Sequence, residues 1–95
     1  MAELLNVEIV AVEAKVWSGQ AQMLIARTTE GELGVLAGHA PLLGELADPG
    51  DVRIKLPTGD ELAYTVNGGF LSVTTEGVTV LAETASPAAA AASSH

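Results

Sequence analysis

The stretch TEGELGVLAGHAPLL, residues 29–43, holds the densest concentration of residues that shape a protein backbone. Its three glycines tolerate backbone angles that other residues avoid, whereas its proline fixes one angle and lacks an N–H donor. The order of these residues predicts a tight turn at Glu30-Gly31, a short apolar strand through Val35, and a shaped loop ending at Pro41. Because binding residues are often carried by shaped loops, the two carboxylates and the histidine of this stretch are candidate contact residues.

Outside this stretch the chain is built from short segments in which apolar and polar residues alternate, as in a half-buried β-strand. The predicted strands cover residues 5–12, 20–29, 42–47, 52–56, 62–66, 70–74 and 78–83. Between them lie turn signals at residues 15–19, 48–51, 57–60, 67–69 and 75–77, each of which contains glycine. A turn about every ten residues predicts an all-β fold, a sandwich of about eight to ten short antiparallel strands in two packed sheets.

The end of the chain differs from the rest in composition. Residues 86–95 consist of alanine and serine with one proline and a final histidine. The run of five alanines is too short to hold a helix alone. We therefore expect one β-domain over residues 1–85, followed by a disordered or weakly helical tail over residues 86–95.

Composition limits the possible functions. Ninety-five residues suit a single domain with one core. The chain has no cysteine, so neither a disulfide framework nor a thiolate metal site is possible. Its twelve acidic residues outnumber four basic ones and give a formal charge of −8, which disfavours nucleic acid and favours a basic protein partner.

No group of residues matches a known type of catalytic or metal site. His39 has no second histidine at ligand spacing, and no serine lies in a Gly-x-Ser-x-Gly turn. Glu30 and Glu32 flank a glycine in an expected turn, so we expect them to be solvated rather than to form a buried acid–base pair. Trp17 could anchor a partner, but a single tryptophan more often caps the open end of a sandwich core. The residues alone predict a small acidic β-domain that contacts another macromolecule, without a catalytic residue, cofactor or metal.

The run TEGELGVLAGHAPL, residues 29–42, resembles the signature of the epsilon subunit of F-type ATP synthases. Further matches follow in the family's order, namely WSG at 17–19, GDVRI at 50–54, VNGGF at 66–70 and VTVLAETA at 78–85. The resemblance covers roughly residues 4–85 and implies a flattened antiparallel β-sandwich of about ten strands. It also implies a non-catalytic subunit of the central stalk, held between the gamma subunit and the c-ring, that helps couple proton translocation to ATP synthesis.

The resemblance further implies which residues meet each partner. Glu32 corresponds to the loop position that meets the polar loops of the c-ring, and Glu30 and Gly31 lie in the same loop. The contacts expected with gamma are Ala11, His39, Ala40, Pro41 and Leu42. The sequence departs from the family at Ala37, where the family often has proline. Residues 86–95 also offer no counterpart to the family's C-terminal hairpin of two helices.

The same resemblance implies a location at the cytoplasmic face of a bacterial cell membrane, as a peripheral subunit of the complex. No apolar run reaches the roughly 20 residues that span a bilayer, and the N-terminus lacks the basic start of a signal peptide. Two alternatives stay open. A freestanding β-sandwich that binds a small ligand or a protein would need an aromatic or polar pocket, and a small barrel enzyme using His39 with a metal would need more histidines.

Overall fold

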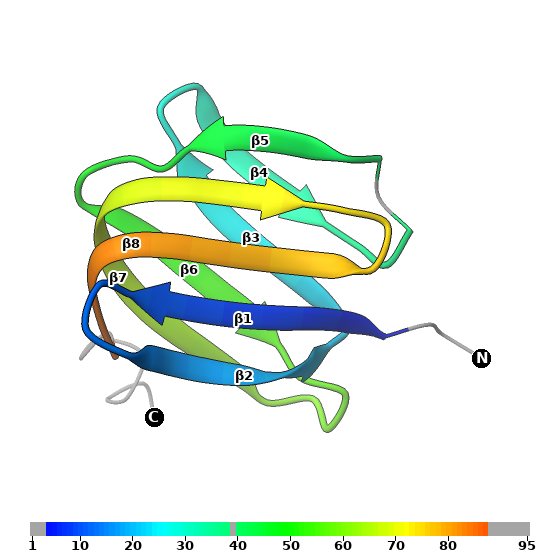
Figure 1. Cartoon of the computed structure of the whole chain (residues 1–95). Helices are drawn as coiled ribbons and strands as arrows, with labels where there is room; N and C mark the ends of the chain where they lie inside the picture. The colour runs from blue at the N-terminus through cyan, green and yellow to red at the C-terminus, as the bar shows by residue number, and fades with distance from the viewer. Residues whose placement is uncertain (1–3, 39, 88–95) are drawn as a thin grey trace.

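The computed structural model describes residues 4–38 and 40–87, which form strands and connecting turns without any helix (Figure 1). The eight strands of these residues are β1 (Leu5–Ala11), β2 (Lys15–Ala21), β3 (Met23–Thr28), β4 (Gly31–Val35), β5 (Leu42–Glu45), β6 (Gly50–Lys55), β7 (Glu61–Val73) and β8 (Gly77–Pro87). Every segment predicted as a strand lies in or overlaps one of them, which confirms the predicted all-β class.

The antiparallel hairpin of β7 and β8 belongs to both layers of the sandwich. Residues 61–66 of β7 pair with β6, whereas residues 70–73 of the same strand pair with β5. Residues 77–82 of β8 pair with β1, whereas residues 85–87 lie beyond β1 and pair with the first half of β7. The hairpin therefore passes from one layer into the other, and one continuous hydrogen-bonded sheet encloses the core (Figure 1).

Layer one consists of β2, β1, the first half of β8, the second half of β7 and β5, in that order. Layer two consists of the second half of β8, the first half of β7, β6, β3 and β4. Counting each half of β7 and β8 separately gives ten segments in the described residues, five per layer, so eight continuous strands build the expected sandwich. One pairing departs from the expected antiparallel arrangement. β1 and β8 are parallel, an arrangement that needs a long connection, and here most of the domain lies between the two strands.

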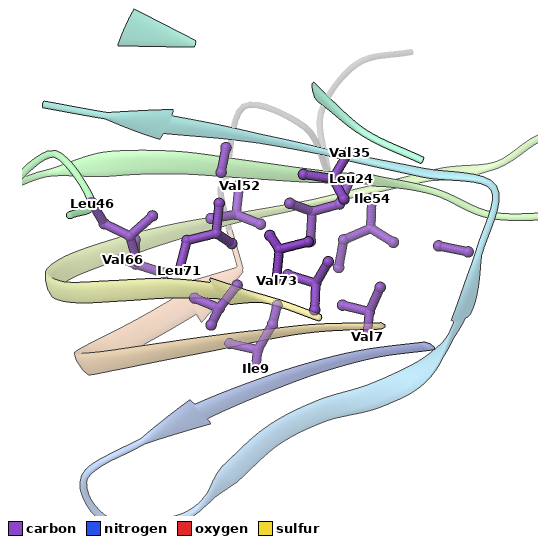
Figure 2. Packing of buried hydrophobic residues seen from close by; sticks show 14 of the residues in the cluster. Val7, Ile9, Leu24, Val35, Leu46, Val52, Ile54, Val66, Leu71 and Val73 are labelled. Carbon is purple, nitrogen blue, oxygen red and sulfur yellow. The ribbon is translucent and has the colours of Figure 1, made fainter. Parts of the chain in front are cut away.

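Alternate residues of the strands point between the two layers and form an aliphatic core (Figure 2). No polar or charged side chain is buried anywhere in residues 4–38 and 40–87. Burying one Val, Leu or Ile side chain contributes about 1.5–3 kcal/mol, so this core is the main source of stability. Its largest fully buried side chains are Val7, Ile9, Leu24, Val35, Val52, Ile54, Val66, Leu71, Val73 and Val80.

Residues 67–69, predicted as a turn, instead lie inside β7. The pairing with β8 keeps one register from Asn67–Thr84 to Gly69–Ala82. Gly68 and Gly69 have φ angles of +63° and +151°, which bend the strand without ending it. The prediction is wrong because an Asn-Gly pair makes a hairpin only where the chain reverses, and here β8 continues alongside.

Residues 15–19, also predicted as a turn, instead form most of β2. This strand pairs with β1, and the chain reverses just before it, where Ala11 and Ala14 exchange backbone hydrogen bonds of 2.9 and 3.2 Å. Gly19 serves packing rather than a turn, because a Cβ there would lie 2.8 Å from the Trp17 ring. Trp17 itself is half-buried and packs against the core, as expected for a capping residue.

The C-terminal strand extends past Ala85 to Pro87, which pairs with Tyr64 of β7. The first two residues of the predicted tail therefore belong to the sheet. The other residues of that tail, 88–95, lie outside the described part of the chain.

Candidate partner-binding surfaces

The β3–β4 turn, which carries Glu30 and Gly31, is closed by the side chain of Thr28. The Thr28 hydroxyl donates to the Gly31 carbonyl at 2.7 Å and accepts from the Glu30 backbone N–H at 3.2 Å. The Thr29 N–H donates to the Glu45 carbonyl at 3.0 Å, which ties the turn to the end of β5. Gly31 has a φ of +129°, a conformation that favours glycine. The predicted tight turn is confirmed, and the exposed Glu30 side chain is carried by a well-fixed backbone.

Glu32 lies in β4, directly after this turn, and has an ion-pair partner within the chain. Arg53 Nη2 donates to Glu32 Oε2 at 3.0 Å, while Arg53 Nε lies 4.0 Å from Oε2 of Glu61. The side chains of Arg53 and Glu32 are 42% and 56% exposed, so this pair adds only about 0.2–1 kcal/mol to stability. Glu32 is therefore exposed, as expected, but it is not free of contacts.

Ala11 lies at the same end of the sandwich as the β3–β4 turn. A series of paired residues in adjacent strands leads from Ala11 to Thr28, which closes the β3–β4 turn. Ala11 pairs with Ala82, Ala82 pairs with Gly69, the Gly69 carbonyl accepts from the Leu46 N–H, and Leu46 forms a bridge with Thr28. We call this the hairpin end, because the β1–β2 and β3–β4 turns both lie there (Figure 1).

Ala40, Pro41 and Leu42 lie at the opposite end, which we call the loop end. There β5 begins beside Val73, the last residue of β7. Ala40 and Pro41 are exposed, whereas Leu42 packs against the core. The structure thus separates Ala11 from residues 40–42, although β1 and β5 belong to the same layer. His39 lies outside the described residues, so its expected contact stays a prediction.

Layer one carries an apolar surface on its outer face that strand periodicity did not predict. Leu81 lies between Val10 and Phe70 in adjacent strands, and Val12 follows at the hairpin end. Leu43 lies close by on β5, beside Ser72 and two residues from the partner of Phe70. Val12, Leu43, Phe70 and Leu81 are 80%, 71%, 50% and 46% exposed. We call Val10, Val12, Leu43, Phe70 and Leu81 the outer patch.

A groove of about 480 Å³ runs along the hairpin-end side of the outer patch. Four residues of the outer patch line it together with Ala11, Gly68, Gly69, Ala82 and Glu83. Gly68 and Gly69 lie in the wall of this groove, at the bend of β7. Ala11, one of the expected gamma contacts, therefore lines an apolar groove.

The outer patch does leave a signal in the sequence, in strands that are apolar on both faces. The outward face of a two-layer antiparallel sandwich is normally polar. In residues 5–12, however, Val10 and Val12 occupy the face opposite to the buried Ile9. In residues 78–83, Leu81 occupies the face opposite to the buried Val80. Apolar residues on both faces of a strand indicate a second contact surface.

Residues 4–38 and 40–87 contain no group of three or more His, Asp or Glu side chains arranged to hold a metal ion. Within the same residues, no helix is long and apolar enough to cross a membrane. The candidate sites in the described chain are thus surfaces rather than a pocket with converging chemical groups.

Comparisons with known proteins agree with this description. Residues 4–88 match the family model described as the β-sandwich domain of the ATP synthase delta/epsilon chain. The ATP synthase epsilon chain of Frankia casuarinae is 58% identical over 81 residues, which are 85% of this chain and 94% of the relative. The ATP synthase epsilon chain of Mycobacterium avium is 56% identical over 85 residues, which are 90% of this chain and 69% of the relative.

A solved structure is also similar. A chain in the cryo-EM structure of the Euglena gracilis mitochondrial ATP synthase (OSCP/F1/c-ring, rotational state 1) superposes with a TM-score of 0.82 at 27% identity. The match covers 88% of this chain and 53% of that chain, so this chain spans about half of the solved one. None of these comparisons supports a freestanding ligand-binding module.

Proposed function

The chain belongs to the delta/epsilon family of ATP synthase chains, and we propose that it is a non-catalytic central-stalk subunit that docks on the gamma subunit and the c-ring. In this role it helps couple proton translocation to ATP synthesis. The family match over residues 4–88 and the epsilon chains of Frankia and Mycobacterium support the subunit assignment. The outer patch is the single observation that supports docking, because an isolated sandwich gains nothing by exposing these side chains.

The outer face of layer one is the best candidate for the surface that meets gamma. It combines the outer patch with the groove lined by Ala11. Residues 40–42 continue this layer at the loop end, so a partner lying along layer one would reach both groups of expected contacts. Apolar side chains at the centre of an interface carry most of the binding free energy, which fits Phe70 and Leu81.

The hairpin end is the best candidate for the contact with the c-ring. Glu30 and Glu32 are exposed there, and Thr28 and the Glu45 carbonyl fix the turn that carries Glu30. A fixed turn loses little conformational entropy on binding, so weak charge pairs with a basic loop are not offset by an ordering cost. Each exposed pair would add only about 0.2–1 kcal/mol, so the apolar contact with gamma should supply most of the binding free energy.

The chain is a subunit of the membrane-bound ATP synthase complex, and its docking sites would hold it at the cytoplasmic face of the cell membrane. The sequence predicted a sandwich over residues 1–85 and a tail over residues 86–95. We keep this division into two parts but move the boundary to Pro87, where β8 ends.

A binding titration of the full chain against purified gamma subunit, by calorimetry, tests the proposed function. Leu81→Ser should weaken binding at least tenfold, because Leu81 lies at the middle of the outer patch. Ile25→Ser is the control, since Ile25 is a half-buried aliphatic residue on the outer face of layer two, opposite Arg53 and outside both groups of expected gamma contacts. Equal affinities of the two variants would refute docking through the outer patch, and no binding by the folded chain would refute gamma as its partner.

A further inference from the structure

Arg53 holds the Glu32 carboxylate across an intervening strand. The strand order is β6-β3-β4, so the side chain of Arg53 on β6 reaches over β3 to meet Glu32 on β4. The register shows that this contact is diagonal. Ile25 of β3 pairs with Arg53, whereas Glu32 pairs with Arg27, one outward-facing position nearer the hairpin end. The contact therefore spans the width of β3 and one outward-facing position along the strands.

We propose that Arg53 competes with the c-ring for Glu32 and so sets the strength of that contact. The inference rests on the proposed function, in which Glu32 pairs with a basic loop of the c-ring. A carboxylate committed to Arg53 must leave it, or share it, before it can meet a cation at the hairpin end. Arg53 is therefore a residue that tunes affinity without itself touching the partner.

Glu61 makes this exchange possible at low cost. Its carboxylate Oε2 lies 4.0 Å from Arg53 Nε, so one guanidinium serves two carboxylates. When Glu32 leaves, Arg53 keeps Glu61 as a partner and is not left unpaired. All three side chains are between 42% and 56% exposed, so water compensates the groups that separate.

Arg27 provides a matched comparison within the same face. It lies directly opposite Glu32 in the β3–β4 pairing, and its side chain is exposed. In the described residues, the only carboxylates within ion-pair distance of an arginine are Glu32 and Glu61, and both face Arg53. Removing Arg27 therefore changes the net charge by the same amount as removing Arg53 but does not release Glu32.

The test is a titration of the full chain into the cognate ATP synthase depleted of its own epsilon chain, at low and at high salt. At low salt, Arg53→Gln should bind about 1.4- to fivefold more tightly than Arg27→Gln, the amount expected when one exposed ion pair no longer competes. Glu32→Gln should weaken wild-type binding, and Arg53→Gln/Glu32→Gln should bind like Glu32→Gln alone. The advantage of Arg53→Gln should shrink towards zero in about 1 M salt. Thermal melts by circular dichroism check that each variant is folded.

Other results overturn the inference in distinguishable ways. If Arg53→Gln binds more weakly, Arg53 positions Glu32 or meets the partner itself, and competition is refuted. If Arg53→Gln and Arg27→Gln bind with equal affinity while Glu32→Gln still weakens binding, Arg53 does not compete for Glu32. The proposed contact of Glu32 with the c-ring then stands. If Glu32→Gln leaves the affinity unchanged, both in the wild-type chain and in the Arg53→Gln variant, then the proposed contact of Glu32 and the competition are both refuted.

Discussion

Replacing Gly69 by alanine should destabilise the domain more than any other single-methyl addition in β7. Gly69 lies where β7 passes from layer two to layer one and pairs with Ala82 of β8. An added Cβ would overlap the carbonyl oxygen of Leu81 and lie 2.7 Å from the Ala82 Cα. Both neighbours are backbone atoms held in register on either side, so neither can move aside alone.

Two separate costs follow from the structure. The φ of +151° is rarely adopted by residues with a side chain and costs about 1–3 kcal/mol. Overlap with a packed neighbour costs a further ~1–3 kcal/mol or more. Together these give a loss of about 2–6 kcal/mol. A domain of this size has a free energy of unfolding of about 4–13 kcal/mol, so the substitution should remove a large part of its stability.

Urea unfolding measures the effect, followed by the fluorescence of Trp17 and by circular dichroism. Two glycines separate the two costs. Gly59 has a φ of +97°, and nothing lies within 4 Å of the Cβ that alanine would add there. Gly59→Ala should therefore show the cost of the unfavourable φ alone. Gly44 has no positive φ, and the atoms nearest to an added Cβ are 3.8 Å away. The free energy of unfolding of Gly44→Ala should therefore stay within about 0.5 kcal/mol of the wild-type value.

The loss of stability in Gly69→Ala is compared with the losses in these two controls. A loss no greater than that of Gly59→Ala would show that the close approach of β7 and β8 does not constrain the side chain. A loss below about 1 kcal/mol would refute the reasoning altogether, because the unfavourable φ by itself should cost at least that much.

Three further substitutions test other parts of the fold. Gly77→Ala should cost at least ~2 kcal/mol in urea unfolding, because its Cβ would overlap the Asn6 carbonyl oxygen in the parallel β1–β8 pair. Leu71→Ala, at a fully buried core position, should lower the free energy of unfolding by about 2–5 kcal/mol with an unchanged urea m-value. Thr28→Val should cost about 0.5–1.5 kcal/mol per lost hydrogen bond and speed amide exchange at Glu30, and an unchanged exchange rate would show that the hydroxyl does not fix the turn.

The features that depend on neighbouring residues were predictable from the sequence. Alternation identified the inward faces of β1 and β6, where Ile9 and Ile54 are fully buried. The Glu30-Gly31 turn was predictable because glycine supplies the positive φ that the turn requires. In each case the cause lies within a few residues of the effect.

The features that depend on strand order were not predictable in the same way. The passage of β7 and β8 between layers looks, in sequence, like a turn between two strands, because glycine serves both purposes. The pairing of Glu32 with Arg53 crosses a third strand, and no local pattern reveals that β6, β3 and β4 are neighbours. The separation of Ala11 from residues 40–42 likewise follows from strand order, because β1 and β5 run in the same direction and Ala11 ends β1 whereas Leu42 begins β5.

Gly69 and Phe70 are adjacent in sequence, yet the structure gives them separable roles in folding and docking. Phe70 is 50% exposed on the outer patch, so Phe70→Ser should cost at most ~1 kcal/mol of stability, well below Gly69→Ala. The same substitution removes the largest side chain of the proposed gamma surface and should weaken gamma binding at least tenfold in calorimetry. If Phe70→Ser instead unfolds the domain, the ring supports the fold rather than a partner. If Phe70→Ser binds gamma with wild-type affinity, the Phe70 ring and the wall that it adds to the groove take no part in docking.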